Sequence, residues 1–183
     1  MPIGMTRMAA GCLVVLAGLS LAGCSGSSKK TTGSGTFAST LPSGGGPLSK
    51  TEFISKMNAV CAAVDTERKS LPTPSGLDDY PAISANLSGT LRILPAFIGQ
   101  ADKLVSRSPD RDLLNSNWLS IEKADFATIK PIAERMVVDS NAKDATKVQA
   151  DGEALSSAPD HSATIATFMS GYGLNSCASL EQD

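Results

Sequence analysis

Apolar residues recur every three or four positions along most of the chain after residue 49, which is the spacing of one face of an α-helix. The first stretch follows a capping box formed by Ser49 and Glu52, and Pro72 ends it. The predicted helices cover 50–71, 79–106, a third stretch from Leu114 to Met136, a weaker one over 142–157, and a short one that starts at Pro159-Asp160 and ends near Gly173.

Strand-like alternation of apolar and polar residues is missing over any useful length, and β-branched residues are sparse. We therefore predict an all-α bundle of four to five helices over residues 49–183, a length that can bury a real core. Because aromatic residues make up only 4% of the chain, Leu, Ile, Val, Met and Ala must form most of that core.

Two prolines fall inside the long helical patterns. Pro95 and Pro131 each remove a backbone hydrogen bond, so each marks either a bend in a continuous helix or a break between two helices. A sharper hypothesis is that two kinks splay the bundle and open an apolar pocket. The residues expected to line it are Leu94, Ile98, Trp118 and Ile132.

The beginning of the chain has the pattern of an export signal. Arg7 precedes an apolar run over 8–22, which is shorter than the ~20 residues that span a bilayer. The run ends in Leu21-Ala22-Gly23-Cys24, which resembles the lipobox of bacterial lipoproteins. We expect a signal peptide over 1–23 and a diacylglyceryl group on the Cys24 thiol. The alternative is an ordinary signal peptide with an incidental cysteine.

Residues 24–48 combine the lipidated Cys24 with a stretch rich in Gly, Ser and Thr, which predicts a flexible tether. The lipid would hold the domain at the extracytoplasmic face of the cell membrane. The chain carries a net charge of −2, and every acidic residue lies at or after Glu52. The domain therefore lacks the basic stripe of a nucleic-acid-binding protein.

The four cysteines divide into two groups. Cys12 leaves with the signal and Cys24 is alkylated, so Cys61 and Cys177 remain as a pair in an oxidising compartment. We predict that they form a disulfide between the first helix and the last residues of the domain. The alternative is two free buried thiols.

Sites with chemical activity are hard to find in the sequence. His161 is the single histidine, which excludes any site that needs two imidazoles, and no metal or cofactor motif is present. Asp160 is expected to cap a helix, with His161 at the surface. Glu122 and Asp125 lie one helical turn apart beside lysines, as on a solvated face, although Asp125 would need a partner if it were buried.

Both ends of the domain resemble a group of small actinobacterial envelope lipoproteins, of the mycobacterial and streptomycete type. The resemblance rests on Asn58-Ala59-Val60-Cys61 near the first end and on Tyr172-Gly173-Leu174 followed by Cys177 near the other. It covers the middle of the domain by helical pattern only. The resemblance implies a helical, disulfide-closed envelope domain and brings no activity with it.

These observations lead to a non-enzymatic, membrane-tethered domain that acts by binding. The expected partner is another envelope protein or a small apolar molecule, and no cofactor is expected. The alternative from a different class is an envelope hydrolase that uses carboxylates such as Glu122 and Asp125, which would require the two side chains to meet in a cleft.

Overall fold

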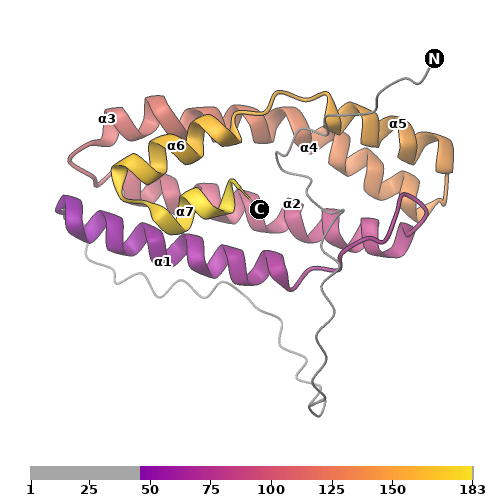
Figure 1. Cartoon of the computed structure of the whole chain (residues 1–183), viewed down its shortest axis with the longest axis horizontal. Helices are drawn as coiled ribbons and strands as arrows, with labels where there is room; N and C mark the ends of the chain where they lie inside the picture. The colour runs from indigo at the N-terminus through magenta and orange to yellow at the C-terminus, as the bar shows by residue number, and fades with distance from the viewer. Residues whose placement is uncertain (1–45, 183) are drawn as a thin grey trace, which may run out of the picture.

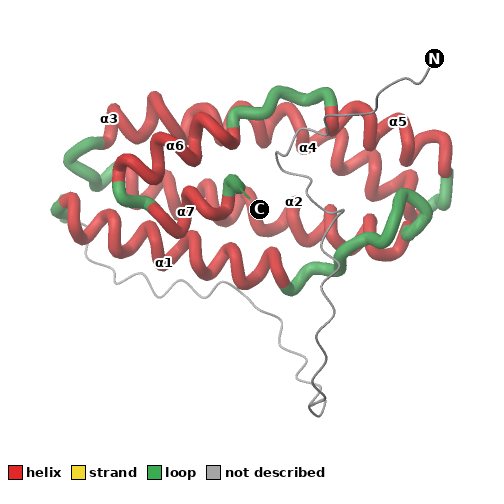
Figure 2. Tube along the Cα trace, in the orientation of Figure 1, coloured by secondary structure: helices red, strands yellow, loops and turns green. Residues whose placement is uncertain are grey.

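The computed structural model describes residues 46–182, and every regular element in that part of the chain is a helix (Figures 1 and 2). The all-α prediction is thereby confirmed, whereas the predicted signal peptide, Cys24 and most of the tether lie outside the described residues. The helices are α1 (Lys50–Lys69), α2 (Tyr80–Val105), α3 (Arg111–Leu114), the π-helical turn η1 (Asn115–Leu119), α4 (Ser120–Asn141), α5 (Ala145–Ser156), α6 (Ser162–Tyr172) and α7 (Asn175–Leu180).

Helix α1 begins at the predicted capping box. The backbone N–H of Glu52 donates to the Ser49 hydroxyl at 3.3 Å, and the Glu52 carboxylate accepts from the backbone N–H of Ser49 at 2.9 Å. These bonds satisfy two donors that a helix start otherwise leaves free. The face that the apolar spacing predicted is the buried one, with Phe53, Met57 and Cys61 fully enclosed.

Helix α2 follows a loop that folds back over it. Asp79 caps the helix by accepting from the backbone N–H of Ala82 at 3.4 Å. The loop residue Leu71 packs directly on Gly89, where a Cβ atom would lie 2.4 Å from Leu71 Cδ2. Glycine at position 89 therefore lets the loop approach the helix. Pro95 lies on an exposed side of α2 and does not interrupt it.

The third predicted helix forms as one continuous helical run of α3, η1 and α4, which also includes Pro131. Both prolines thus lie within continuous helices, and the alternative of a break between helices is wrong. The π-helical turn carries Trp118, whose ring is fully buried and 6.3 Å from the ring of Phe97. A π turn holds one extra residue, so it shifts the helical register where this large side chain enters the core.

Helices α2 and α4 pack antiparallel along much of their length (Figure 1). Lys123 contacts Asp102 at 2.6 Å near one end, and Ser84 donates to Asn141 at 2.9 Å near the other. Helices α1, α6 and α7 cover the larger apolar core at one end of this pair. Helix α5 packs on α4 at the opposite end, over a smaller core of Ile83, Leu87, Ala133, Met136 and Val148.

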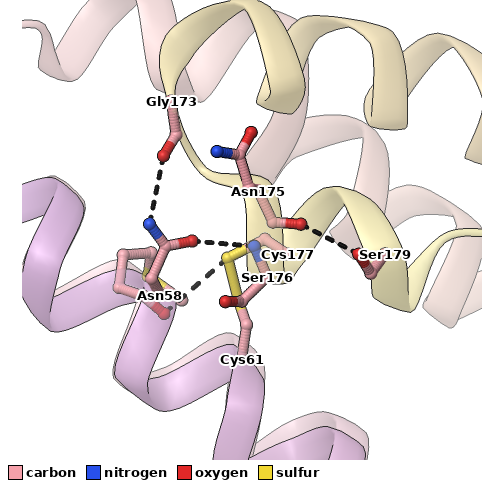
Figure 3. Close-up of a disulfide and its surroundings, with 8 residues drawn as sticks. Asn58, Cys61, Gly173, Asn175, Ser176, Cys177 and Ser179 are labelled. Atoms are coloured by element: carbon pink, nitrogen blue, oxygen red, sulfur yellow. Dashed lines mark hydrogen bonds between the residues drawn. A yellow bond between two sulfur atoms is a disulfide. The ribbon is translucent and has the colours of Figure 1, made fainter.

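The end of the domain returns to α1 through the disulfide between Cys61 and Cys177, whose sulfurs lie 2.06 Å apart (Figure 3). The predicted pairing is thereby confirmed. Gly173 ends α6 with a φ of 97°, a left-handed conformation that glycine adopts without strain. The chain then forms α7, a helix that the sequence pattern did not predict because it is only six residues long.

Asn58 joins the same two segments with its side-chain amide (Figure 3). Its nitrogen donates to the Gly173 carbonyl at 3.0 Å, and its oxygen accepts from the backbone N–H of Ser176 at 2.9 Å. Leu174 occupies the N-cap position of α7 and has no side-chain acceptor. Asn58 therefore supplies from α1 the capping oxygen that α7 lacks locally.

The described part of the chain begins beside the first turn of α1. Leu48, which the sequence places at the end of the tether, is only 7% exposed, and its backbone N–H donates to the Arg107 carbonyl at 2.8 Å. Tyr172 lies nearby and donates its hydroxyl to Asp110 at 2.8 Å, while Lys50 lies 4.2 Å from the centre of its ring. The start of α1, the α2–α3 loop and the end of α6 thus meet at one place.

We expect Asn58→Ala to lower the free energy of unfolding by about 1–3 kcal/mol, because it leaves two polar backbone groups without their partner. Urea unfolding followed by circular dichroism measures this difference. Asn175→Ala is the matched control, since its exposed side-chain amide forms no hydrogen bond among the described residues. An equal loss of stability in both variants would contradict the capping role of Asn58.

Candidate functional site

A half-open pocket of about 200 Å³ lies where the end of α1, the loop after it, the middle of α2 and the end of α7 meet. Helix α4 contributes one residue from its first turn. The pocket is lined by Val64, Asp65, Arg68, Lys69, Leu71, Thr73, Asn86, Thr90, Leu94, Phe97, Glu122, Leu180 and Glu181.

One part of the pocket wall is apolar. Leu94 and Phe97 come from α2, Leu71 comes from the loop, and Val64 and Leu180 come from α1 and α7. Phe97 also packs against Trp118, so this wall is backed by the main core. The apolar surface is therefore held by residues with little freedom to move.

The polar part of the wall includes the carboxyl groups of Asp65, Glu122 and Glu181, of which Asp65 is paired with Lys69. Burial and, to a smaller extent, the nearby Asp125 raise the pKa of Glu122 to about 7, although Arg68 acts in the opposite direction. Burial and, to a smaller extent, the charge of Glu122 raise the pKa of Glu181 to about 8, and Arg68 again acts in the opposite direction. Neither Glu122 nor Glu181 forms a hydrogen bond or an ion pair within residues 46–182. Each is thus left in a site that disfavours its charged form.

The positive charge of Arg68 lowers the pKa of both Glu122 and Glu181. Its guanidinium donates to the backbone carbonyl of Leu180 at 2.9 Å, so it also holds the last turn of α7 against α1. The neighbouring pair of Lys69 and Asp65 is joined at 2.7 Å along α1. The cations of the pocket are therefore already engaged with groups of the protein itself.

Asp125 forms an ion pair with His161 and does not line the pocket. The Nδ1 atom of His161 lies 2.9 and 3.0 Å from the two Asp125 oxygens. His161 is half exposed, and this contact joins α4 to the start of α6. The N-cap position of α6 is His161, and Asp160, one residue earlier, accepts from the backbone N–H of Ser162 at 3.0 Å. Asp125 is near enough to Glu122 to affect its pKa, but it does not line the pocket.

Of the four residues expected to line an apolar pocket, Leu94 alone does so. Trp118 is fully buried in the main core, and Ile98 packs against that core. Ile132 is partly buried and lies on α4, away from this pocket. The pocket thus has a lining different from the one expected, because Trp118 packs against Phe97 inside the core instead of facing a cavity.

Sequence reasoning missed two residues of the pocket, Arg68 at the end of α1 and Glu181 directly after α7. A signal for both exists in the predicted disulfide. Arg68 follows Cys61 along α1, and Glu181 follows Cys177 by one helical turn. If the last residues are helical, the disulfide brings these two side chains to the same region. The prediction failed because α7 was not recognised as a helix.

Within residues 46–182 no group of three or more His, Cys, Asp or Glu side chains is arranged to hold a metal ion. In the same range, no helix has the length and hydropathy needed to cross a bilayer. Comparison of the chain with protein-family models, with curated proteins and with solved structures gave no match.

We expect Glu122→Gln to stabilise the protein at high pH. A carboxyl whose pKa rises from 4.5 to about 7 on folding makes the folded state bind more protons, so the free energy of unfolding falls as pH rises through that window. A glutamine at position 122 does not ionise, so the free energy of unfolding of the variant lacks this fall with pH. The variant should match the wild type at pH 4.5 and exceed it above pH 7 by on the order of 2 kcal/mol in urea unfolding.

Glu134→Gln is the control for this comparison. Glu134 is exposed on the same helix and contacts Lys130 at the surface, where an ion pair contributes little. Its substitution should leave the pH dependence of unfolding unchanged. A Glu122→Gln protein that loses stability at every pH would contradict the unfavourable burial of the Glu122 charge.

Proposed function

We propose that this protein is a lipid-anchored lipoprotein of the cell envelope whose helical domain binds a small molecule in the pocket between α1, α2 and α7. The pocket carries the proposal, because it joins an apolar wall to two carboxyl groups that have no partner of their own within the described residues. Sites that bind small molecules combine apolar surface with polar groups that orient the ligand, and this pocket has both.

The placement of the domain outside the cytoplasm rests on two features. The lipobox-like sequence that ends at Cys24 is one of them. The disulfide between Cys61 and Cys177 is the other, since structural disulfides persist mainly in oxidising compartments. Together they support an extracytoplasmic domain held to the membrane by lipid.

The position of the pocket suits a tethered receptor. The chain enters the domain at Leu48, beside the first turn of α1, whereas the pocket lies at the last turn of that helix. A rise of 1.5 Å per residue puts Arg68 about 27 Å along α1 from Lys50. The pocket thus opens far from the point where the tether attaches, and the membrane would not block it.

A second candidate is the envelope hydrolase. The pKa of Glu122 near 7 is the observation that favours it, because a general acid or base works best near the ambient pH. Asp65 and Glu181 share the pocket with Glu122, but Asp65 is paired with Lys69, and Asp125 contacts His161. A hydrolase would therefore use Glu122 with Glu181 rather than the pair expected from the sequence.

Substitution of Cys24 by alanine should release a folded domain from the membrane. Fractionation of cells and mass spectrometry of the released protein would show the loss of the lipid and an intact disulfide. Cys12→Ala is the matched control and should leave the protein in the membrane, because Cys12 lies within the apolar run. An unfolded or membrane-bound Cys24→Ala protein would contradict the proposed anchor.

Native mass spectrometry of the lipidated protein, purified from its own membrane, should detect a copurifying small molecule. Leu94→Trp would fill the pocket and should abolish that mass shift. Val138→Trp is the control, since Val138 is 65% exposed on α4 and does not line the pocket. A ligand retained equally by both variants, or no ligand in the wild type, would count against the binding function.

A further inference from the structure

We propose that the ligand of this pocket is an alkylammonium compound, whose charged nitrogen lies between Glu122 and Glu181 and whose carbon chain lies on Leu94 and Phe97. This inference rests on the proposed function and names the chemical class of its ligand. It follows from the charges around the pocket, from the shape of its apolar wall and from its size.

Glu122 and Glu181 differ from the other charged groups around the pocket in having no hydrogen-bond or ion-pair partner among the described residues. On α1, Asp65 is paired with Lys69, and Arg68 is bound to the Leu180 carbonyl. Asp125 on α4 is paired with His161, and Asp160 accepts from the backbone N–H of Ser162. The charged groups that face Glu122 and Glu181 from neighbouring elements thus have partners. Glu122 and Glu181 form no hydrogen bond or ion pair inside the described range, and Arg68 is the one cation that acts on both.

The class of ligand follows from what these two carboxyl groups lack. An anion would add repulsion, and a neutral apolar molecule would bury two polar groups without a partner. An ammonium group has three donors and no acceptor, so it can donate to both carboxylates at once. Its positive charge would also replace the proton that the carboxyl pair holds near neutral pH.

The apolar wall of the pocket would contact the carbon chain of the alkylammonium ligand. Leu94 and Phe97 lie one helical turn apart on α2, on the same face, with Val64 and Leu180 beside them. The volume of about 200 Å³ is smaller than the ~300–1,000 Å³ of pockets that enclose drug-sized ligands. The pocket therefore fits a short aliphatic amine, or the amine end of a longer compound that extends into solvent.

Binding of such a cation must be coupled to the loss of a proton. The carboxyl pair binds the cation best when both groups are ionised, and their pKa values of about 7 and about 8 place that change near neutrality. Affinity should therefore increase as the pH rises from 6 to 8.5, a range over which an alkylammonium keeps its charge.

The test uses n-butylammonium chloride as the probe, with n-butanol and sodium butyrate as a neutral and an anionic molecule of matched size. The full lipidated protein is placed in nanodiscs of zwitterionic lipid, and empty nanodiscs give the background. Isothermal titration calorimetry should find n-butylammonium bound at least tenfold more tightly than either analogue at pH 8.5. Its affinity should fall about tenfold at pH 6, and binding at pH 7.5 should release protons to the buffer.

The double variant Glu122→Gln/Glu181→Gln should lose the preference for n-butylammonium over n-butanol, while Glu134→Gln keeps it. Circular dichroism shows that each variant is folded before titration. Equal binding of the three probes, an affinity independent of pH, or a preference that survives in the double variant would overturn the inference. If n-butylammonium does not bind but a neutral molecule copurifies with the protein, the inference falls and the binding function stands.

Discussion

The contact between α1 and the last residues of the domain is the constraint on which the rest of the structure depends. Helix α7 is too short to be stable alone and has no capping side chain at its start. Asn58 supplies the missing acceptor, and Cys61 binds Cys177 covalently one turn further along α1. In the chain-entropy model, a loop of this length contributes about 4–5 kcal/mol by restricting the unfolded chain.

This contact also creates the pocket. The disulfide holds the start of α7 against the middle of α1. The end of α7, with Leu180, then lies beside the last turn of α1, where Arg68 donates to the Leu180 carbonyl. Burial is the main cause of the raised pKa of Glu122, and Asp125, one helical turn further along α4, raises it as well.

The parts of the fold that sequence reasoning predicted are those that local patterns determine. Apolar spacing located the buried face of α1, the capping box at Ser49 marked its first residue, and the count of cysteines identified the disulfide. The Asn-Ala-x-Cys and Tyr-Gly-Leu-x-x-Cys elements now have a physical meaning, since Asn58 bonds to the segment that Gly173 turns. What was missed depends on distant contacts. Neither Glu181 beside Glu122 nor Trp118 in a π-helical turn has a local signature.

The two buried carboxyl groups and the disulfide have opposite effects on stability. Bringing Glu122 and Glu181 together disfavours folding once both are ionised, because two like charges then share a site of low polarity. The disulfide opposes this cost by acting on the unfolded chain, so its contribution does not depend on which carboxyl groups carry a charge. A domain closed by packing alone could relieve the repulsion by releasing α7. With Cys177 bound to Cys61 the last helix stays docked, so the repulsion is relieved by protonation of the pair or, as we propose, by a bound cation.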